Sequence, residues 1–181
     1  MSVDVVFLHG AGPGAFDADA RLADSLAGEL GAGYTVHRPR FPEDDLDDLR
    51  WFDALTAALA TARAPLVLVG HSAGGYMLLR YLANRPVTTP VAAMCLIAAP
   101  FPGGDAEWTF DDFELPADID RHLPVDAAVR LYASEDDAIV PFAHRDLYAA
   151  AIPRARVRTV TGGHQIGDDL RIVAADIRAL T

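Results

Sequence analysis

The sequence predicts an α/β protein, a three-layer α/β/α sandwich in which helices cover both faces of a mostly parallel sheet of about six strands. Short apolar runs rich in β-branched residues alternate along the chain with stretches whose apolar residues recur at helical spacing. Glycine and proline clusters separate the two kinds of segment. The 181 residues, of which 51% are hydrophobic, are enough for one domain (1–181) with a substantial core.

Each predicted strand is a short apolar run bounded by turn-forming residues. The third run is apolar throughout, as expected of a strand that is buried on both faces. The predicted strands are residues 3–8, 34–37, 65–69, 91–98, 127–133 and 156–160.

Five stretches between or after these runs are predicted to be helices: 17–30, 46–62, 76–83, 142–151 and 166–180. Three of them carry a clear apolar stripe that we expect to face the sheet. The stripes consist of Leu22, Leu26 and Leu30, then Leu49, Phe52, Leu55 and Leu59, and finally Leu170, Val173 and Ile177. Residues 100–124 have no clear period and are predicted to be a long connection.

Composition excludes several classes of partner. The net charge of −11, from 15 basic and 26 acidic residues, argues against nucleic acid and anionic membranes. No apolar run approaches the ~20 residues of a membrane span, and the N-terminus has no pattern of a signal peptide. The single Cys95 lies in an apolar run, so we expect a buried thiol in a reducing, cytoplasmic setting.

The sequence Gly70-His71-Ser72-Ala73-Gly74 stands between a predicted strand and a predicted helix. G-x-S-x-G in this context predicts a nucleophile elbow, a tight turn that exposes the serine hydroxyl. Glycine is needed at 70 and 74 because a β-carbon there would collide with the crossing strand and helix. A glycine-rich turn with a capping serine is the simpler alternative.

Partners for Ser72 are expected after other strands, because catalytic groups of parallel sheets gather at the carboxyl ends of the strands. Asp136 and Asp137 follow the fifth predicted strand, and His164 follows the sixth after two glycines. The order Ser, acid, His is that of a hydrolase triad. His164 would act as the base and one of the two aspartates would orient it.

The other histidines are weaker candidates for the base: His9, His37, His71, His122 and His144. His9 and His71 adjoin the glycine loops of the site and are predicted to position them or to contact substrate. Neither has neighbouring acids at ligand spacing, so no metal site is predicted. Asp168 and Asp169 are interpreted as acidic residues in the first turn of the last helix.

An acyl-transfer enzyme also needs backbone donors for the oxyanion. The N–H of Ala73, next to the nucleophile, is predicted to be one of them. The second is expected from the loop after the first strand, where Ala11 is our choice. Pro13 in the same loop has no N–H.

The sequence resembles the α/β-hydrolase family in four motifs that span nearly the whole chain in the family's order. They are Leu8-His9-Gly10, the elbow at 70–74, the S-x-x-D-x-x-V-P run at 134–141, and Gly163-His164. The short length and the lack of a large cap domain are similar to small serine hydrolases related to the retinoblastoma-binding-protein hydrolase and its bacterial relatives.

The resemblance implies a parallel sheet with its strands in the order second, first, third, fourth, fifth, sixth. It places the acid three residues before the Val-Pro, which favours Asp137 over Asp136. It also implies hydrolysis of esters, thioesters or amides through an acyl-enzyme intermediate, without a cofactor, on a small acyl substrate.

The connection at 100–124 stands where related hydrolases place specificity segments. Its aromatic residues Phe101, Trp108, Phe110 and Phe113 either line the pocket or pack locally on the domain. Acidic residues accompany them, so a site covered by this segment suits neutral or apolar acyl groups better than anions.

Parts of the sequence are also compatible with two other functions. Residues 10–15 fit G-x-G-x-x-[G/A] after a strand, and Arg38 and Arg40 follow the second strand, as in an NADP-binding Rossmann protein. That interpretation leaves Ser72, Asp137 and His164 unexplained. The other is a hydrolase-fold protein that binds a partner without turnover.

Overall fold

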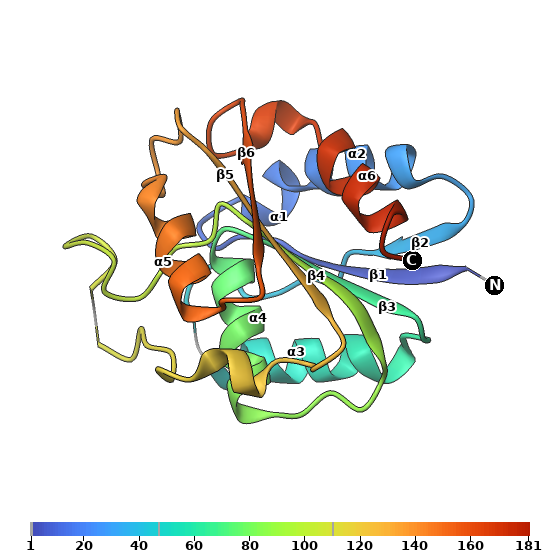
Figure 1. Cartoon of the computed structure of the whole chain (residues 1–181), viewed down its shortest axis with the longest axis horizontal. Coiled ribbons are helices and arrows are strands. Elements are labelled where there is room, and N and C mark those ends of the chain that lie inside the picture. The colour runs from blue at the N-terminus through green and yellow to red at the C-terminus, as the bar shows by residue number, and fades with distance from the viewer. Residues whose placement is uncertain (1, 47, 110) are drawn as a thin grey trace.

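The computed structural model describes residues 2–46, 48–109 and 111–181, and one sheet of six parallel strands forms its centre (Figure 1). The strands are β1 Val3–Leu8, β2 Tyr34–His37, β3 Leu66–His71, β4 Val91–Ile97, β5 Ala128–Ser134 and β6 Arg156–Val160. Their order is β2-β1-β3-β4-β5-β6, and every neighbouring pair is parallel. The predicted fold class and strand order are therefore confirmed.

Helices cover both faces of this sheet (Figure 1). One face packs against α3 (Asp48–Thr61), α4 (Ala73–Asn84) and α5 (Ala143–Ala151), and the other against α2 (Ala20–Leu30) and α6 (Arg171–Arg178). Successive side chains of a strand alternate between the two layers. In β1, Val6 and Leu8 join the first core, whereas Val5 and Phe7 join the second.

The helix expected at 17–30 is two helices, α1 (Ala15–Ala18) and α2, which meet at the buried Asp19. The helix expected at 166–180 is also divided, into a 3₁₀ turn (Ile166–Asp168) and α6. Gly167 and Asp168 have φ of 60° and 58°, a left-handed conformation that cannot continue a right-handed helix. The interpretation of Asp168 and Asp169 as first-turn residues of the last helix is therefore wrong. Asp168 instead pairs with Arg21 at 3.0 Å.

Leu49 was expected on the inward stripe of α3, but its side chain is 68% exposed. The buried stripe contains Phe52, Leu55 and Leu59 as predicted, together with Trp51. Trp51 stacks on Phe41 with ring centroids 4.7 Å apart. The face of α3 that packs on the sheet is therefore centred on Trp51, Phe52, Leu55 and Leu59, and Leu49 lies outside it.

The connection after β4 contains one 3₁₀ turn, Ile119–His122, and buries Phe113, Ile119 and Leu123 against the α4 side of the sheet. Cys95 is fully buried in β4, as predicted, and burial raises the pKa of its thiol to about 12. No helix in the described residues is both long and apolar enough to cross a bilayer.

Candidate active site

Ser72 stands at the junction of β3 and α4, where the chain turns sharply from strand to helix. Its backbone has φ 51° and ψ −129°, a conformation that costs free energy for any residue other than glycine. The Ser72 N–H donates to the carbonyl of Ile97 at 2.8 Å, which ties the turn to β4. A strained serine at the carboxyl end of a central strand is the geometry of a nucleophile elbow.

The glycines that flank Ser72 allow the strand and helix to cross closely. A β-carbon at Gly70 would lie 2.6 Å from Cα of Gly75 in α4. One at Gly74 would collide with the carbonyl oxygens of Leu8 and His9 at the end of β1. Both contacts are with backbone, which cannot move aside without displacing an element. The prediction that both positions require glycine is confirmed.

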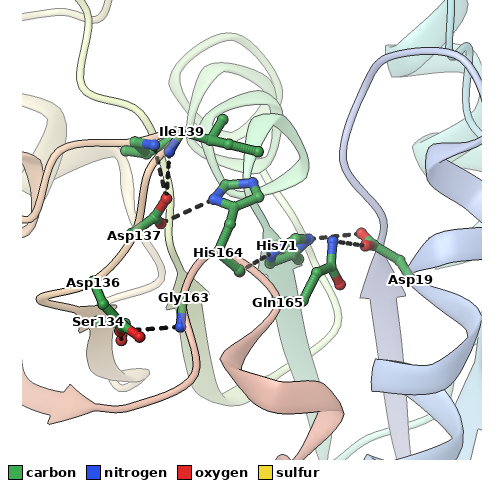
Figure 2. Close-up of polar contacts among 10 residues, drawn as sticks. Asp19, His71, Ser134, Asp136, Asp137, Ile139, Gly163, His164 and Gln165 are labelled. Atoms are coloured by element: carbon green, nitrogen blue, oxygen red, sulfur yellow. Dashed lines mark hydrogen bonds and ion pairs between the residues drawn. The ribbon is translucent and has the colours of Figure 1, made fainter.

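His164 follows β6 and pairs with Asp137, which follows β5 (Figure 2). The His164 Nδ1 atom lies 2.9 Å from Asp137 Oδ2. The other oxygen, Oδ1, accepts the N–H groups of Ile139 (2.8 Å) and Val140 (2.9 Å), which fixes the carboxylate in place. Burial by itself raises the pKa of Asp137, but the hydrogen bonds from His164 and these two N–H groups outweigh it and lower the pKa.

Asp136, the other candidate acid, has different partners. Its Oδ1 atom accepts hydrogen bonds from the Ser134 hydroxyl and from the Gly163 N–H (3.1 Å). These bonds lower the pKa of Asp136. Figure 2 shows this contact on the backbone before His164 and the Asp137 contact on the ring. Asp136 therefore holds the loop that carries His164, and Asp137 orients the imidazole.

Ser72 and His164 line one open pocket of about 330 Å³. In the described part of the chain, the Ser72 hydroxyl and the His164 Nε2 atom make no hydrogen bond to each other or to another residue. Such a bond often tightens only when substrate is bound. The apolar lining of the pocket includes Leu46, Trp108, Ile139 and the alanines and proline of the loop after β1.

The two predicted oxyanion donors also border this pocket. Ala73 begins α4, where a helix leaves its first N–H groups without intrahelical acceptors, and Ala11 lies in the loop after β1. Within the described residues, neither N–H has a hydrogen-bond acceptor. Both are therefore available to an atom that enters the pocket.

Of the aromatic residues expected to contact substrate, the structure brings Trp108 to the pocket. Phe101 is not among the lining residues, which corrects that prediction. Its ring packs edge-on against Tyr148 at 4.9 Å, and its N–H donates to His144 Nδ1 at 2.9 Å. Local packing holds Phe101 on the domain. Phe110 lies outside the described residues.

His9 was predicted either to position the loop after β1 or to contact substrate. The second alternative is wrong, because His9 is fully buried and absent from the pocket lining. Its Nδ1 lies 2.6 Å from the Gly10 carbonyl, and its Nε2 accepts the Phe41 N–H at 2.9 Å. The second bond requires an unprotonated Nε2, and burial lowers the pKa of the ring. His9 is thus a neutral brace for the loop after β1.

His71 borders the pocket, but both of its ring nitrogens are engaged within the protein. Nδ1 lies 2.7 Å from Asp19 Oδ2, and Nε2 lies 2.9 Å from the His164 carbonyl (Figure 2). Asp19, which contacts His71 here, was not among the site residues predicted from the sequence. The helix expected at 17–30 is interrupted at residue 19, but the regular spacing of its apolar residues gives no sign of the interruption.

The remaining histidines lie elsewhere. His37 pairs with Asp4 on the neighbouring strand, His122 with Asp118 at the surface, and His144 with Asp105.

The Rossmann interpretation does not fit the fold. β1 pairs with β2 and β3, whereas in the Rossmann order it lies between the second and fourth strands. The guanidinium groups of Arg38 and Arg40, which were considered for a 2′-phosphate, lie over the ring of Phe16 at 4.5 and 4.3 Å.

Similar solved structures share this fold. The product of the ydeN gene of B. subtilis superposes with a TM-score of 0.74 and 21% identity over 99% of this chain and 97% of its own. The esterase domain of a Rhodothermus marinus protein has a TM-score of 0.65 and 21% identity, over 97% and 84% of the two chains. An esterase from Exiguobacterium antarcticum has a TM-score of 0.64 and 15% identity, over 98% and 91%.

No curated protein matches this chain in sequence. The sequence model described as the alpha/beta hydrolase family matches residues 5–178, from the first strand to the last helix. The matched range contains the elbow, both candidate acids and the histidine after β6. The chain therefore belongs to the alpha/beta hydrolase family.

Proposed function

We propose that this protein is a serine hydrolase that cleaves an ester, thioester or amide of a small neutral acyl group. One observation carries the proposal. A strained serine, an imidazole with one unoccupied nitrogen, and two backbone N–H groups without acceptors border the same pocket. These are the nucleophile, base and oxyanion donors that acyl transfer requires.

In this mechanism, His164 Nε2 takes the proton of the Ser72 hydroxyl while Oγ bonds to the substrate carbonyl carbon. The carbonyl oxygen becomes an oxyanion and accepts hydrogen bonds from the N–H groups of Ala11 and Ala73. His164 then returns the proton to the leaving alcohol, thiol or amine, and an acyl-Ser72 remains. Asp137 holds the imidazole with Nδ1 protonated and stabilises its charged form.

Water completes the cycle. His164 Nε2 removes a proton from the water molecule as its oxygen attacks the acyl carbon. Collapse of the second oxyanion breaks the bond to Ser72 Oγ, which takes back the proton from His164. The products are a carboxylic acid and the free enzyme.

The lining of the pocket supports a neutral acyl group. Trp108, Leu46 and Ile139 provide apolar surface, and the connection that carries Trp108 also contains acidic residues. The net charge of −11 further disfavours anionic substrates. Esters of short neutral acids should be turned over faster than monoesters of dicarboxylic acids with the same chain length.

The test is labelling of Ser72 by a fluorophosphonate together with hydrolysis of a series of p-nitrophenyl esters, thioesters and aminoacyl amides. Ser72→Ala should fold normally, resist labelling and lose activity by about 10⁴-fold or more. Wild-type turnover by Ser72→Ala would refute the proposal. Labelling without turnover of any substrate in the series would instead favour the alternative of a binding protein with the same fold.

A further inference from the structure

The carboxylate of Asp19 joins three loops at the carboxyl end of the sheet. Its Oδ2 atom accepts the N–H of Gly10, after β1, at 2.8 Å and faces Nδ1 of His71, at the end of β3, at 2.7 Å. Its Oδ1 atom accepts the side-chain amide of Gln165, after β6, at 3.1 Å. Figure 2 shows Gln165 and His71 directed at Asp19 from the side of His164. The loops that carry Ala11, Ser72 and His164 thus share one buried anchor.

Both ring nitrogens of His71 face acceptors. Nδ1 meets the Asp19 carboxylate and Nε2 meets the His164 carbonyl. An acceptor requires an N–H, and a neutral imidazole has only one. The partners therefore require the doubly protonated, charged ring.

The surroundings favour that charge. Burial by itself lowers the pKa of His71, but the hydrogen bond and charge of Asp19, with the His164 carbonyl, outweigh it and raise the pKa. Burial likewise raises the pKa of Asp19, but the bonds from His71, Gly10 and Gln165 lower it. Asp19 and His71 form a buried ion pair, with side chains only 2% and 1% exposed.

We propose that the Asp19–His71 ion pair positions the general base by holding the backbone of His164. This inference rests on the proposed function, in which His164 is that base. The His71 Nε2–H holds the His164 carbonyl at 2.9 Å, while Asp137 holds its ring at 2.9 Å. With the residue fixed at its peptide and at Nδ1, Nε2 is directed towards one place in the pocket.

The charge is essential to this arrangement. If His71 loses a proton, it keeps either the bond to Asp19 or the bond to the His164 carbonyl. The first choice releases the base, and the second detaches the elbow from Asp19. Because the hydrogen-bonding groups of Asp19 and His71 are used within the protein, their loss should lower kcat rather than weaken substrate binding.

The first measurement is of the protonation of His71 by NMR of protein labelled with ¹⁵N-histidine at pH 7.5. The wild-type ring should carry protons on both nitrogens, although the reference pKa of histidine is ~6.5. Through-bond correlation assigns the signals, so this measurement needs no variant. A His71 ring with a single proton at this pH overturns the proposal.

Asp19→Asn keeps the shape of the side chain and removes its charge. The His71 ring should then carry one proton at pH 7.5, kcat should fall by about 10- to 100-fold, and KM should change less than about twofold. Asp17→Asn is the matched control, since Asp17 is exposed in α1 and outside the pocket lining, and it should match wild type. His71→Gln is the second variant if Asp19→Asn does not fold.

A folded Asp19→Asn enzyme with wild-type kcat, or with its whole loss in KM, overturns the positioning role. Failure of the proposed function would look different. In that case, Ser72→Ala and His164→Ala would retain turnover, whatever the protonation of His71.

Discussion

Two histidine–aspartate pairs lie side by side at the carboxyl edge of the sheet and differ in the partner of one ring nitrogen. His164–Asp137 and His71–Asp19 have similar separations, 2.9 and 2.7 Å, and the two rings are 4.9 Å apart. In the first pair, Nε2 has no partner among the described residues and the ring borders the pocket. In the second, Nε2 is held by a carbonyl. The unoccupied Nε2 of His164 can accept a proton, as the proposed mechanism requires, whereas the occupied Nε2 of His71 holds a backbone carbonyl.

A third pair extends the comparison. His144 faces Asp105 through Nε2 at 3.0 Å, and its Nδ1 accepts the N–H of Phe101 at 2.9 Å. A donor at one nitrogen and a carboxylate at the other suit a neutral ring with one N–H. All three rings face an aspartate through one nitrogen. They differ in what the other nitrogen contacts: a carbonyl in His71, an N–H group in His144 and no described residue in His164.

The largest expected effect distinguishes His164 from His71. His164→Ala should lower kcat/KM by about 10⁴-fold or more, because Ser72 then has no group to accept its proton. The measurement is kcat/KM on a p-nitrophenyl ester for the wild type and the folded variant.

His122→Ala is the control for this prediction, because His122 is exposed at the surface, where it pairs with Asp118. It should keep the wild-type kcat/KM. A folded His164→Ala enzyme that keeps the wild-type kcat/KM would remove His164 from the mechanism.

The adjacent acids should differ nearly as much. Asp137→Asn should cost about 10³- to 10⁴-fold in kcat, because an amide neither fixes the tautomer of His164 nor stabilises its charged form. Asp136→Asn should cost about tenfold or less, since that side chain holds the Gly163 N–H and not the ring. Steady-state kinetics of the two folded variants make the comparison. A larger loss in Asp136→Asn would reverse their roles.

The pairing of His164 with an acid after β5 was predictable from the sequence, whereas the pairing of His71 with Asp19 was not. The elbow and the histidine after β6 follow from local patterns, each contained within a few residues. The strand order was implied by the resemblance to the α/β-hydrolase family, and the structure confirms it. The structure pairs His164 with Asp137, the acid favoured by the motif register. Asp19 has no local pattern, because its partners His71 and Gln165 are 52 and 146 residues away.

The direction in which a side chain points was the second property that the sequence did not predict. His9 and Phe101 lie next to the loops of the site, as their positions in the sequence suggested, but point into the domain. Nothing in the spacing of a loop determines which way a ring turns. The left-handed residues Gly167 and Asp168, which divide the last helix, are likewise set by tertiary contacts such as the pair of Asp168 with Arg21.

The smallest expected effect concerns stability and tests the pair of His71 with Asp19 alone. A raised pKa in the folded state means that His71 stabilises the fold fully below the unfolded pKa of ~6.5, and that this contribution is lost as pH rises through the folded pKa. The lowered pKa of His9 has the opposite sign, and its contribution is complete above pH ~6.5. The raised pKa of the Cys95 thiol affects the free energy of unfolding only from about pH 8.5 upwards, where the thiol of the unfolded chain begins to ionise. The interval from pH 6.5 to 8.5 therefore isolates His71 from these two groups.

Within that interval, the free energy of unfolding of the wild type should fall as pH rises, with a slope of at most about 1.4 kcal/mol per pH unit for one proton. His71→Gln should be less stable at pH 6.5, because Asp19 is left as a buried charge without its partner. Its free energy of unfolding should also depend less on pH than that of the wild type, so the two curves converge towards pH 8.5. Urea unfolding at pH 6.5, 7.5 and 8.5 measures both slopes, with His122→Gln as the control that should follow the wild type. Parallel curves for the wild type and His71→Gln would mean that folding does not raise the pKa of His71. The two histidine–aspartate pairs would then differ in geometry and not in charge.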